Sequence, residues 1–426
     1  MSLKKPSYIV NIIERTLNHT DRRLIDHGKR VAYLVYRVLK KDNRLTDKQI
    51  RDCCLIGLLH DIGAYKTEEI SNMTSFETGK VWEHSIYGYL FVKHFSPLAH
   101  LSPILLFHHS TLEELNYLHP DYRDFAQIIF LADRLDILSL GDRNDWDHLV
   151  SIFDNAVFDP KIVDLFFKGE GSITAKDFDR QYDEDFINLL YNSDFTPDEV
   201  TAYLHMAILS IEFRSPQTVS HTFTTVKLCE LLAPKLGLNV EKIKLGALLH
   251  DIGKVGVSLD ILESNKALSA EEFSLMKDHV LTTKAILDGL VSDDVLNLAI
   301  NHHEKLNGGG YARNLQAKDL TLGERLVAIA DIFSALVGSR TYKDSFSKEK
   351  IMSIFKSEVE NGNLDLDIVN LVLDNYEYLI EETKKTVQTM QETYKKIDDE
   401  YNKLIFLQEN FKSGEPSLYI DYPLIW

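Results

Sequence analysis

The stretch LLHDIG, at residues 58–63, returns unchanged at residues 248–253. Each copy places a histidine beside an aspartate, with a glycine two positions later. Adjacent residues in a helix point about 100° apart, so both side chains reach one point only where the helix frays before the glycine. The stretch therefore predicts two helix ends, each holding an imidazole and a carboxylate close together.

A longer ordered series surrounds both copies. A lone histidine precedes each copy, and another histidine, a His-His pair and an aspartate after alanine follow it. The first series is His27, His60, Asp61, His84, His108, His109 and Asp133, and the second is His221, His250, Asp251, His279, His302, His303 and Asp331. Offsets of 190 to 198 residues relate the two series, which indicates an internal duplication.

Apolar residues recur at three and four positions along most of the chain, a pattern typical of helices. We therefore predict an all-α fold: tandem helical bundles followed by a long C-terminal helix. The repeat places the first domain at 1–204 and the second at 205–372, with the helix and tail at 373–426. In residues 387–404, apolar residues are spaced alternately by three and four and form a seam flanked by Glu and Lys. This pattern fits either a helix packed on its own domain or a coiled coil that forms a homodimer.

Composition excludes several classes of protein. A net charge of −18 over 426 residues argues against binding a nucleic-acid polymer or an anionic membrane. Apolar runs stay short of the roughly 18 residues of a membrane span, and MSLKKPSYIV is not a signal peptide, so we expect a cytoplasmic protein. The cysteines Cys53, Cys54 and Cys229 lack paired spacing, which favours reduced thiols.

The two series have the chemistry of metal sites. Neutral imidazoles and carboxylates are ligands for iron, manganese and zinc, and an Asp carboxylate can bridge two ions in a hydrolytic site. One histidine on an apolar helix is more often a core residue than a ligand, but ten of the sixteen histidines belong to the ordered series. The other six have no counterpart at the repeat offset, and we interpret them as structural: His19, His94, His100, His119, His148 and His205.

These residues resemble the HD superfamily of metal-dependent phosphohydrolases, whose hallmark is H…HD…H…HH…D on a helical bundle. The second unit resembles the HD-GYP branch, through HDIGK at 250–254, HHEKLNGGGYARNL at 302–315 and ADIFSALVGSRTYK at 330–343. The first unit resembles only the general HD pattern, over 27–133.

The resemblance implies that the seven residues of the second series bind two divalent metals, iron or manganese, with Asp251 bridging. It also implies that Arg340 and Lys343 hold phosphate, and that Gly310 and Tyr311 shape the nucleotide pocket. Lys254 is placed to ligate a metal or assist the leaving oxygen; otherwise it is a solvated lysine. The implied reaction is hydrolysis of cyclic di-GMP or cyclic GMP-AMP to a linear dinucleotide or mononucleotide.

Three positions depart from the HD-GYP pattern: Asn307 and Ser334 replace aspartates, and Ala312 replaces proline. None is an expected metal ligand, so we predict a change in substrate preference or rate before any loss of metal. A fourth departure is Gln217, where some members have a glutamate that binds a third metal, so we predict two metals.

The first unit keeps the whole ligand series but has Ala64 in place of the lysine after HDIG and lacks a GYP loop. It fits a second hydrolase, a metal-holding regulatory domain or a structural duplicate, and we favour further metal there. For the whole chain, the rival to an enzyme is a non-catalytic signalling module that binds metal and nucleotide.

Overall fold

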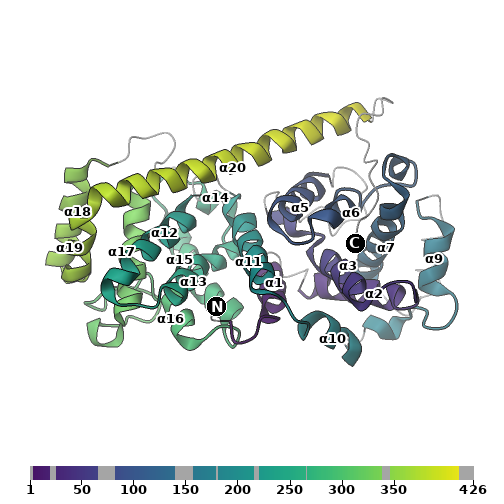
Figure 1. Ribbon diagram of the computed structural model, residues 1–426, viewed down its shortest axis with the longest axis horizontal. Helices are drawn as coiled ribbons and strands as arrows, with labels where there is room; N and C mark the ends of the chain where they lie inside the picture. The colour runs from purple at the N-terminus through teal and green to yellow at the C-terminus, as the bar shows by residue number, and fades with distance from the viewer. Residues whose placement is uncertain are drawn as a thin grey trace. The chain divides into compact units, whose positions relative to one another are not determined.

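The computed structural model describes residues 3–19, 25–65, 82–139, 157–178, 181–214, 220–264, 266–337 and 346–411. Over these residues the protein is helical, with isolated bridges but no β-strand (Figure 1). The predicted all-α fold is confirmed. In the same part of the chain, no helix combines the length and apolar character needed to cross a membrane.

The chain divides into two compact units. The N-terminal unit comprises residues 9–210 and 397–426, and the C-terminal unit comprises residues 1–8 and 211–396. The first eight residues join the C-terminal unit through a bridge between Leu3 and Val291 and a hydrogen bond from Lys4 N to Leu290 O at 3.0 Å. The domain boundaries at 204 and 372 stay a prediction.

The N-terminal unit packs α2 against α3 and α7, and α5 against α6 and the 3₁₀ turn η2. Its helices are α1 (Tyr8–Asn18), α2 (His27–Leu39), α3 (Asp47–Leu59), α5 (Trp82–Phe95), α6 (Ser102–Leu106), α7 (Pro120–Ser139), α9 (Pro160–Phe167), α10 (Glu184–Tyr191) and α11 (Pro197–Glu212), which continues past the unit's end. Its 3₁₀ turns are η2 (Ile62–Tyr65), η3 (Ala99–Leu101), η4 (Glu114–Tyr117) and η6 (Ala175–Phe178).

The C-terminal unit repeats this plan: α12 packs against α13 and α17, and α15 against η8. Its helices are α12 (His221–Leu232), α13 (Val240–Leu249), α14 (Leu259–Leu262), α15 (Ala270–Leu287), α16 (Asp293–Ile300), α17 (Leu322–Val337), α18 (Lys348–Glu360) and α19 (Leu366–Asp374). Its 3₁₀ turns are η7 (Ala233–Leu236), η8 (Ile252–Gly256) and η9 (Ala317–Asp319). A core around Leu228, Leu326 and Phe333 is almost fully buried.

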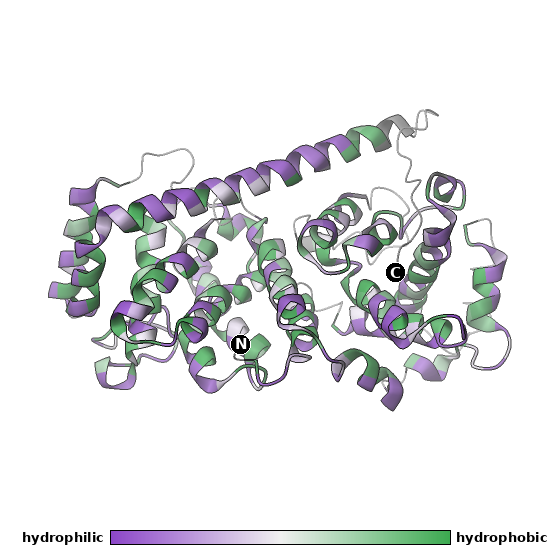
Figure 2. Cartoon of the chain, in the orientation of Figure 1, coloured by the Kyte–Doolittle hydropathy of each residue, from purple (hydrophilic) through white to green (hydrophobic). Residues whose placement is uncertain are grey.

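The last helix, α20 (Tyr376–Phe411), is mostly hydrophilic (Figure 2). Its predicted seam packs on the chain itself: Ile397 is buried, Tyr394 stacks on Phe213 at 5.1 Å and Tyr401 stacks on Tyr87 at 4.2 Å between ring centroids. These contacts favour the interpretation of a helix packed on its own chain. A homodimer through α20 stays a prediction, and the tail from residue 412 lies outside the described residues.

The glycine of LLHDIG is required by close packing in both units. A Cβ on Gly253 would lie 2.0 Å from the carbonyl oxygen of His279 in α15, and one on Gly63 would lie 1.9 Å from that of His84 in α5. The turn after each His-Asp pair therefore presses on the helix that carries the next histidine of the series. Thr283 fastens this contact in the C-terminal unit, because its Oγ1 donates to His250 O at 3.2 Å and accepts from Gly253 N at 3.0 Å.

We predict that Gly63→Ala destabilises the N-terminal unit, because its methyl group collides with backbone that cannot yield without separating η2 from α5. The expected cost is about 1–3 kcal/mol, the usual range for overpacking. Urea denaturation followed by circular dichroism measures it. The control is Gly88→Ala in the same unit, where the added Cβ meets nothing closer than 3.6 Å. Equal stability of the two variants would show that the close approach is unimportant.

Candidate metal centre

Each His-Asp pair lies where a helix gives way to a 3₁₀ turn. α13 ends at Leu249, His250 caps it and Asp251 precedes η8. His60 caps α3 in the same way. The predicted helix ends are confirmed, and they turn consecutive side chains towards one point.

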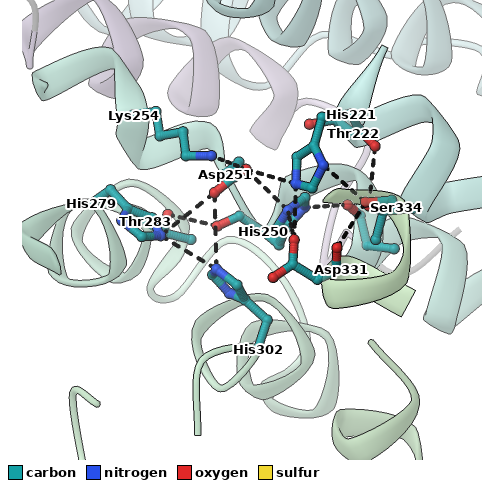
Figure 3. A network of polar contacts seen from close by, with 12 residues as sticks. His221, Thr222, His250, Asp251, Lys254, His279, Thr283, His302, Asp331 and Ser334 are labelled. Atoms are coloured by element: carbon teal, nitrogen blue, oxygen red, sulfur yellow. Dashed lines mark hydrogen bonds and ion pairs between the residues drawn. The ribbon is translucent and has the colours of Figure 1, made fainter. Parts of the chain in front are cut away.

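In the C-terminal unit, Asp251 lies between two histidine clusters (Figure 3). Its Oδ2 is 3.1 Å from Nε2 of His250 and 3.7 Å from Nε2 of His221. Its Oδ1 is 3.5 Å from Nε2 of His279 and 3.9 Å from Nε2 of His302. Each carboxylate oxygen therefore faces a different cluster, as a bridging ligand must.

Asp331, on α17, faces both sides of the same centre. Its Oδ1 lies 2.9 Å from Nε2 of His221 and 3.6 Å from Nε2 of His250, and its Oδ2 lies 3.9 Å from Nδ1 of His303. Two sets of ligand atoms each fall within 4.8 Å of one another: His221 with His250 and Asp251, and His279 with His302 and His303. The structure thus brings all seven residues of the second series together.

The N-terminal unit repeats this arrangement. Asp61 Oδ2 lies 3.2 Å from Nε2 of His60 and 3.6 Å from Nε2 of His27, while its Oδ1 lies 3.8 Å from Nε2 of His84. Asp133 Oδ1 is 3.3 Å from Nε2 of His27. Two sets again meet the 4.8 Å distance: His27 with His60 and Asp133, and Asp61 with His84, His108 and His109.

Backbone carbonyls fix which nitrogen of several histidines faces the centre. His250 Nδ1 contacts Ala247 O at 2.7 Å, and His302 Nδ1 contacts Ala299 O at 2.7 Å. The same contact to the carbonyl three residues earlier is made by His60, His108 and His279. Because a carbonyl only accepts, each of these Nδ1 atoms carries a proton, and Nε2 is the nitrogen that faces the centre, as in metal-binding imidazoles.

Several of the atoms that face the centres are buried and have no hydrogen-bond partner among the residues that the structure describes. They are His250 Nε2 and Asp251 Oδ1 in one unit, and His108 Nε2 with both carboxylate oxygens of Asp61 in the other. A buried polar atom left unpaired lowers the stability of the folded state by about 1–3 kcal/mol. The rest of the fold must therefore offset this loss of stability. Bound cations would satisfy all of them, and the residues therefore fit a metal centre in each unit.

The spacing of opposed imidazoles supports the same fit. Nε2 of His279 lies 3.3 Å from Nε2 of His302, and Nε2 of His27 lies 3.2 Å from Nε2 of His60. Two nitrogens bound to one ion at about 2.1 Å lie roughly 3.0–3.4 Å apart at octahedral or tetrahedral angles. Each pair already has the separation of two ligands on one ion.

The pKa shifts differ among the histidines of the C-terminal centre. Burial lowers the pKa of His302 well below its usual range and that of His303 to about 4, so both rings are neutral. Burial also disfavours the proton on His250, but the charges of Asp251 and Asp331 outweigh it and raise its pKa to about 10. The carboxylates thus draw positive charge to the place that a divalent ion would take.

Comparison with known proteins identifies the two units. The HD domain family matches residues 205–368 and matches again at residues 24–138. The chain carries two HD domains in tandem.

Relatives of this tandem HD protein are named as cyclic-dinucleotide phosphodiesterases. The 3'3'-cGAMP-specific phosphodiesterase 1 of Vibrio cholerae is 28% identical over 85% of this chain and 90% of its own. A cyclic di-GMP phosphodiesterase of Thermotoga maritima is 35% identical over 40% of this chain and 44% of its own. A solved cyclic GMP-AMP specific phosphodiesterase of V. cholerae has a TM-score of 0.47 and 16% identity, and the match covers 91% of this chain and 98% of that one.

The two HD domains place different basic side chains beside the carboxylates of their centres. Lys254 Nζ lies 2.5 Å from Asp251 Oδ2, and although burial opposes its charge, Asp251 and Glu212 raise its pKa. This partly buried ion pair argues against a solvated lysine. In the N-terminal domain, Ala64 takes the lysine's place, and Arg134 instead donates to Asp133 Oδ2 at 2.7 Å.

The first histidine of each series is also held differently. His27 Nδ1 contacts Asp136 Oδ2 at 2.7 Å, and Arg30 donates to both oxygens of Asp136. At the corresponding position, Ser334 Oγ contacts His221 Nδ1 at 2.8 Å and also lies 2.8 Å from Thr225 Oγ1. A charged pair therefore supports His27, whereas neutral hydroxyl groups support His221.

Sequence reasoning missed two residues behind the C-terminal centre, Glu212 and Arg214. Glu212 is buried at the end of α11, accepts a hydrogen bond from Thr222 and lowers the cost of burying the charge of Lys254. Arg214 donates to the carbonyl oxygens of Lys254, Val255 and Val257 and so braces η8. Neither residue belongs to the ordered His/Asp series, so that series does not single them out.

The loop that follows His303 is tied down by polar groups. Buried Glu304 accepts from Arg313 N at 2.6 Å and from Leu315 N at 2.9 Å. Asn307 accepts from Gly309 N at 2.8 Å and donates to Asn363 Oδ1 at 2.7 Å. The amide thus makes a donor contact that the aspartate of the HD-GYP pattern could not make.

Gly310 and Tyr311 lie beside the centre, since Tyr311 N donates to His303 O at 3.3 Å. Arg340, Lys343 and Gln217 lie outside the described residues.

We predict that the two HD domains depend unequally on the group behind their first histidine. Asp136→Asn should weaken metal retention by the N-terminal domain about 10–100-fold, the usual effect of losing such a carboxylate. Ser334→Ala should weaken the C-terminal domain less than tenfold, because only a neutral hydrogen bond is lost. Chelator competition measures both, each in a background whose other His-Asp pair is replaced by alanines.

The control is Arg30→Gln, which breaks the buried ion pair but leaves the carboxylate on His27. If Arg30→Gln releases metal as readily as Asp136→Asn, the effect is loss of local structure and the assigned role of Asp136 is wrong.

Proposed function

We propose that the C-terminal HD domain is a metal-dependent phosphodiesterase that hydrolyses a cyclic dinucleotide, cyclic di-GMP or cyclic GMP-AMP, to a linear dinucleotide or mononucleotide. The observation that carries the proposal is Asp251, whose two oxygens face separate histidine clusters. The names of the relatives supply the substrate class. We place this activity in the cytoplasm.

Two divalent ions, iron or manganese, fit the ligand chemistry of this domain. His221, His250 and Asp331 would hold one ion, His279, His302 and His303 would hold the other, and Asp251 would bridge them. Such ions lower the pKa of a bound water to near neutrality and offset charge on the phosphoryl oxygens. The neutral rings of His302 and His303 are ready to bind without losing a proton.

Lys254 is the proposed proton donor. Its ammonium lies against Asp251 Oδ2 at the edge of the centre, and Asp251 and Glu212 keep it charged despite burial. Hydrolysis breaks a bond between phosphorus and a ribose oxygen, and that oxygen takes up a proton as it leaves. An ammonium at this place can supply the proton. General acid catalysis of this kind typically raises the rate about 10²–10⁴-fold.

We propose that Arg340 and Lys343 bind phosphate and that the loop at Gly310 and Tyr311 borders the nucleotide. For the N-terminal HD domain we propose a metal-holding role without this reaction, because its own cation, Arg134, is committed to Asp133 and Ala64 supplies no proton.

We predict that only the C-terminal HD domain hydrolyses cyclic dinucleotides. Replacing both His250 and Asp251 with alanine should lower turnover of cyclic di-GMP and cyclic GMP-AMP at least about 100-fold. Replacing both His60 and Asp61 should remove metal but leave most of that turnover. Chromatographic product analysis with each dinucleotide, alongside elemental analysis, measures both effects.

Full activity after loss of His250 and Asp251 would contradict the proposal. Tight binding of a dinucleotide with intact metals but no product would instead show a non-catalytic signalling module.

A further inference from the structure

An exposed aromatic ring lies close to the C-terminal centre. Phe273, in the first turn of α15, is 45% exposed and belongs to no part of the core. Single exposed apolar residues are common on protein surfaces, so exposure alone says little. The surroundings of this ring are more informative.

Phe273 continues a row of rings that begins at the metal centre. The ring centroid of Tyr311 lies 4.7 Å from that of His303, and the centroid of Phe273 lies 6.3 Å from that of Tyr311. Close backbone packing sets the row: a Cβ on Gly310 would lie 2.5 Å from Glu304 Cα and 2.6 Å from His303 O. Gly310 therefore lets the loop place Tyr311 between the candidate ligand and the exposed ring.

A cation shares this row. Lys277, one helical turn after Phe273, places its Nζ 4.6 Å from the Phe273 centroid and 5.5 Å from that of Tyr311. Within the described residues, no carboxylate lies within ion-pair distance of Lys277. Its charge is thus available to a ligand that lies on the rings.

We infer that Phe273, Tyr311 and Lys277 form a subsite for a guanine base of the substrate, an inference that rests on the proposed cyclic-dinucleotide activity. Aromatic rings bind bases by stacking, worth about 1–3 kcal/mol per base. A lysine ammonium donates to O6 and N7 of guanine, whereas adenine presents an amino donor at the position of O6. The flexible side chain of Lys277 lets the ammonium move from the ring faces to the edge of a stacked base.

This subsite narrows the substrate class. A dinucleotide with at least one guanine, such as cyclic di-GMP or cyclic GMP-AMP, can place that base on the rings while a phosphate reaches the metal centre beside His303. Cyclic di-AMP lacks the acceptor at position 6 and should be the poorest substrate of the three.

The test uses the full-length, metal-loaded protein. Phe273→Ala should raise KM for cyclic di-GMP and weaken binding of GMP about 5- to 150-fold, the change that corresponds to the stacking energy. Phe273→Tyr should restore both values, because the ring is kept. The matched control is Leu275→Ala, which removes a side chain on the same helix that is 55% exposed and should bind GMP as wild type does.

Lys277→Met tests the preference for guanine. We expect wild type to bind GMP more tightly than AMP in titration calorimetry, and the variant to lose that difference while its metal content stays the same. Equal GMP binding by wild type and Phe273→Ala overturns the subsite, and an unchanged GMP-to-AMP ratio in Lys277→Met overturns its guanine preference.

The same measurements separate this inference from the proposed function. If wild type hydrolyses no cyclic dinucleotide but Phe273→Ala still loses GMP binding, the proposed reaction fails and the subsite stands. If wild type hydrolyses cyclic di-GMP with a KM that Phe273→Ala does not change, the reaction stands and the subsite fails.

Discussion

A single carboxylate shared by two histidine clusters is the constraint around which each unit is built. Asp251 and Asp61 can serve both clusters only because each follows a histidine at the end of a helix, where the backbone turns sharply. The turn is held by direct backbone contact with the next histidine helix, at Gly253 and at Gly63. The repeated LLHDIG is therefore as much a packing motif as a chemical one.

Around this shared plan the two domains have diverged in their charges. In the C-terminal domain a lysine faces the carboxylate of Asp251, with buried Glu212 behind it, and neutral hydroxyls support the first histidine. In the N-terminal domain, Arg134 and Arg30 are fixed on Asp133 and Asp136. The same seven-residue series is thus surrounded by different charges in the two domains.

The sequence predicted the helical class, the duplication and the residues that meet at each centre, because an ordered series with one offset depends only on the fold being repeated. It could not predict the supporting groups. Asp136 and Arg30 lie 106 positions apart, and nothing in a sequence pairs two such charges. Glu212 and Arg214 likewise act through contacts with Lys254 and its turn, about 40 residues further along the chain. The seam of α20 also left two interpretations open, since packing on the chain itself and packing on a second copy require the same spacing.

Anomalous diffraction from crystals of the metal-loaded protein, collected at the absorption edge of the bound metal, tests the shared carboxylate most directly. We expect two peaks in the C-terminal domain, about 3.5–4 Å apart, with one oxygen of Asp251 directed at each. A single peak on one side of Asp251, with His279, His302 and His303 bound to no ion, would contradict it.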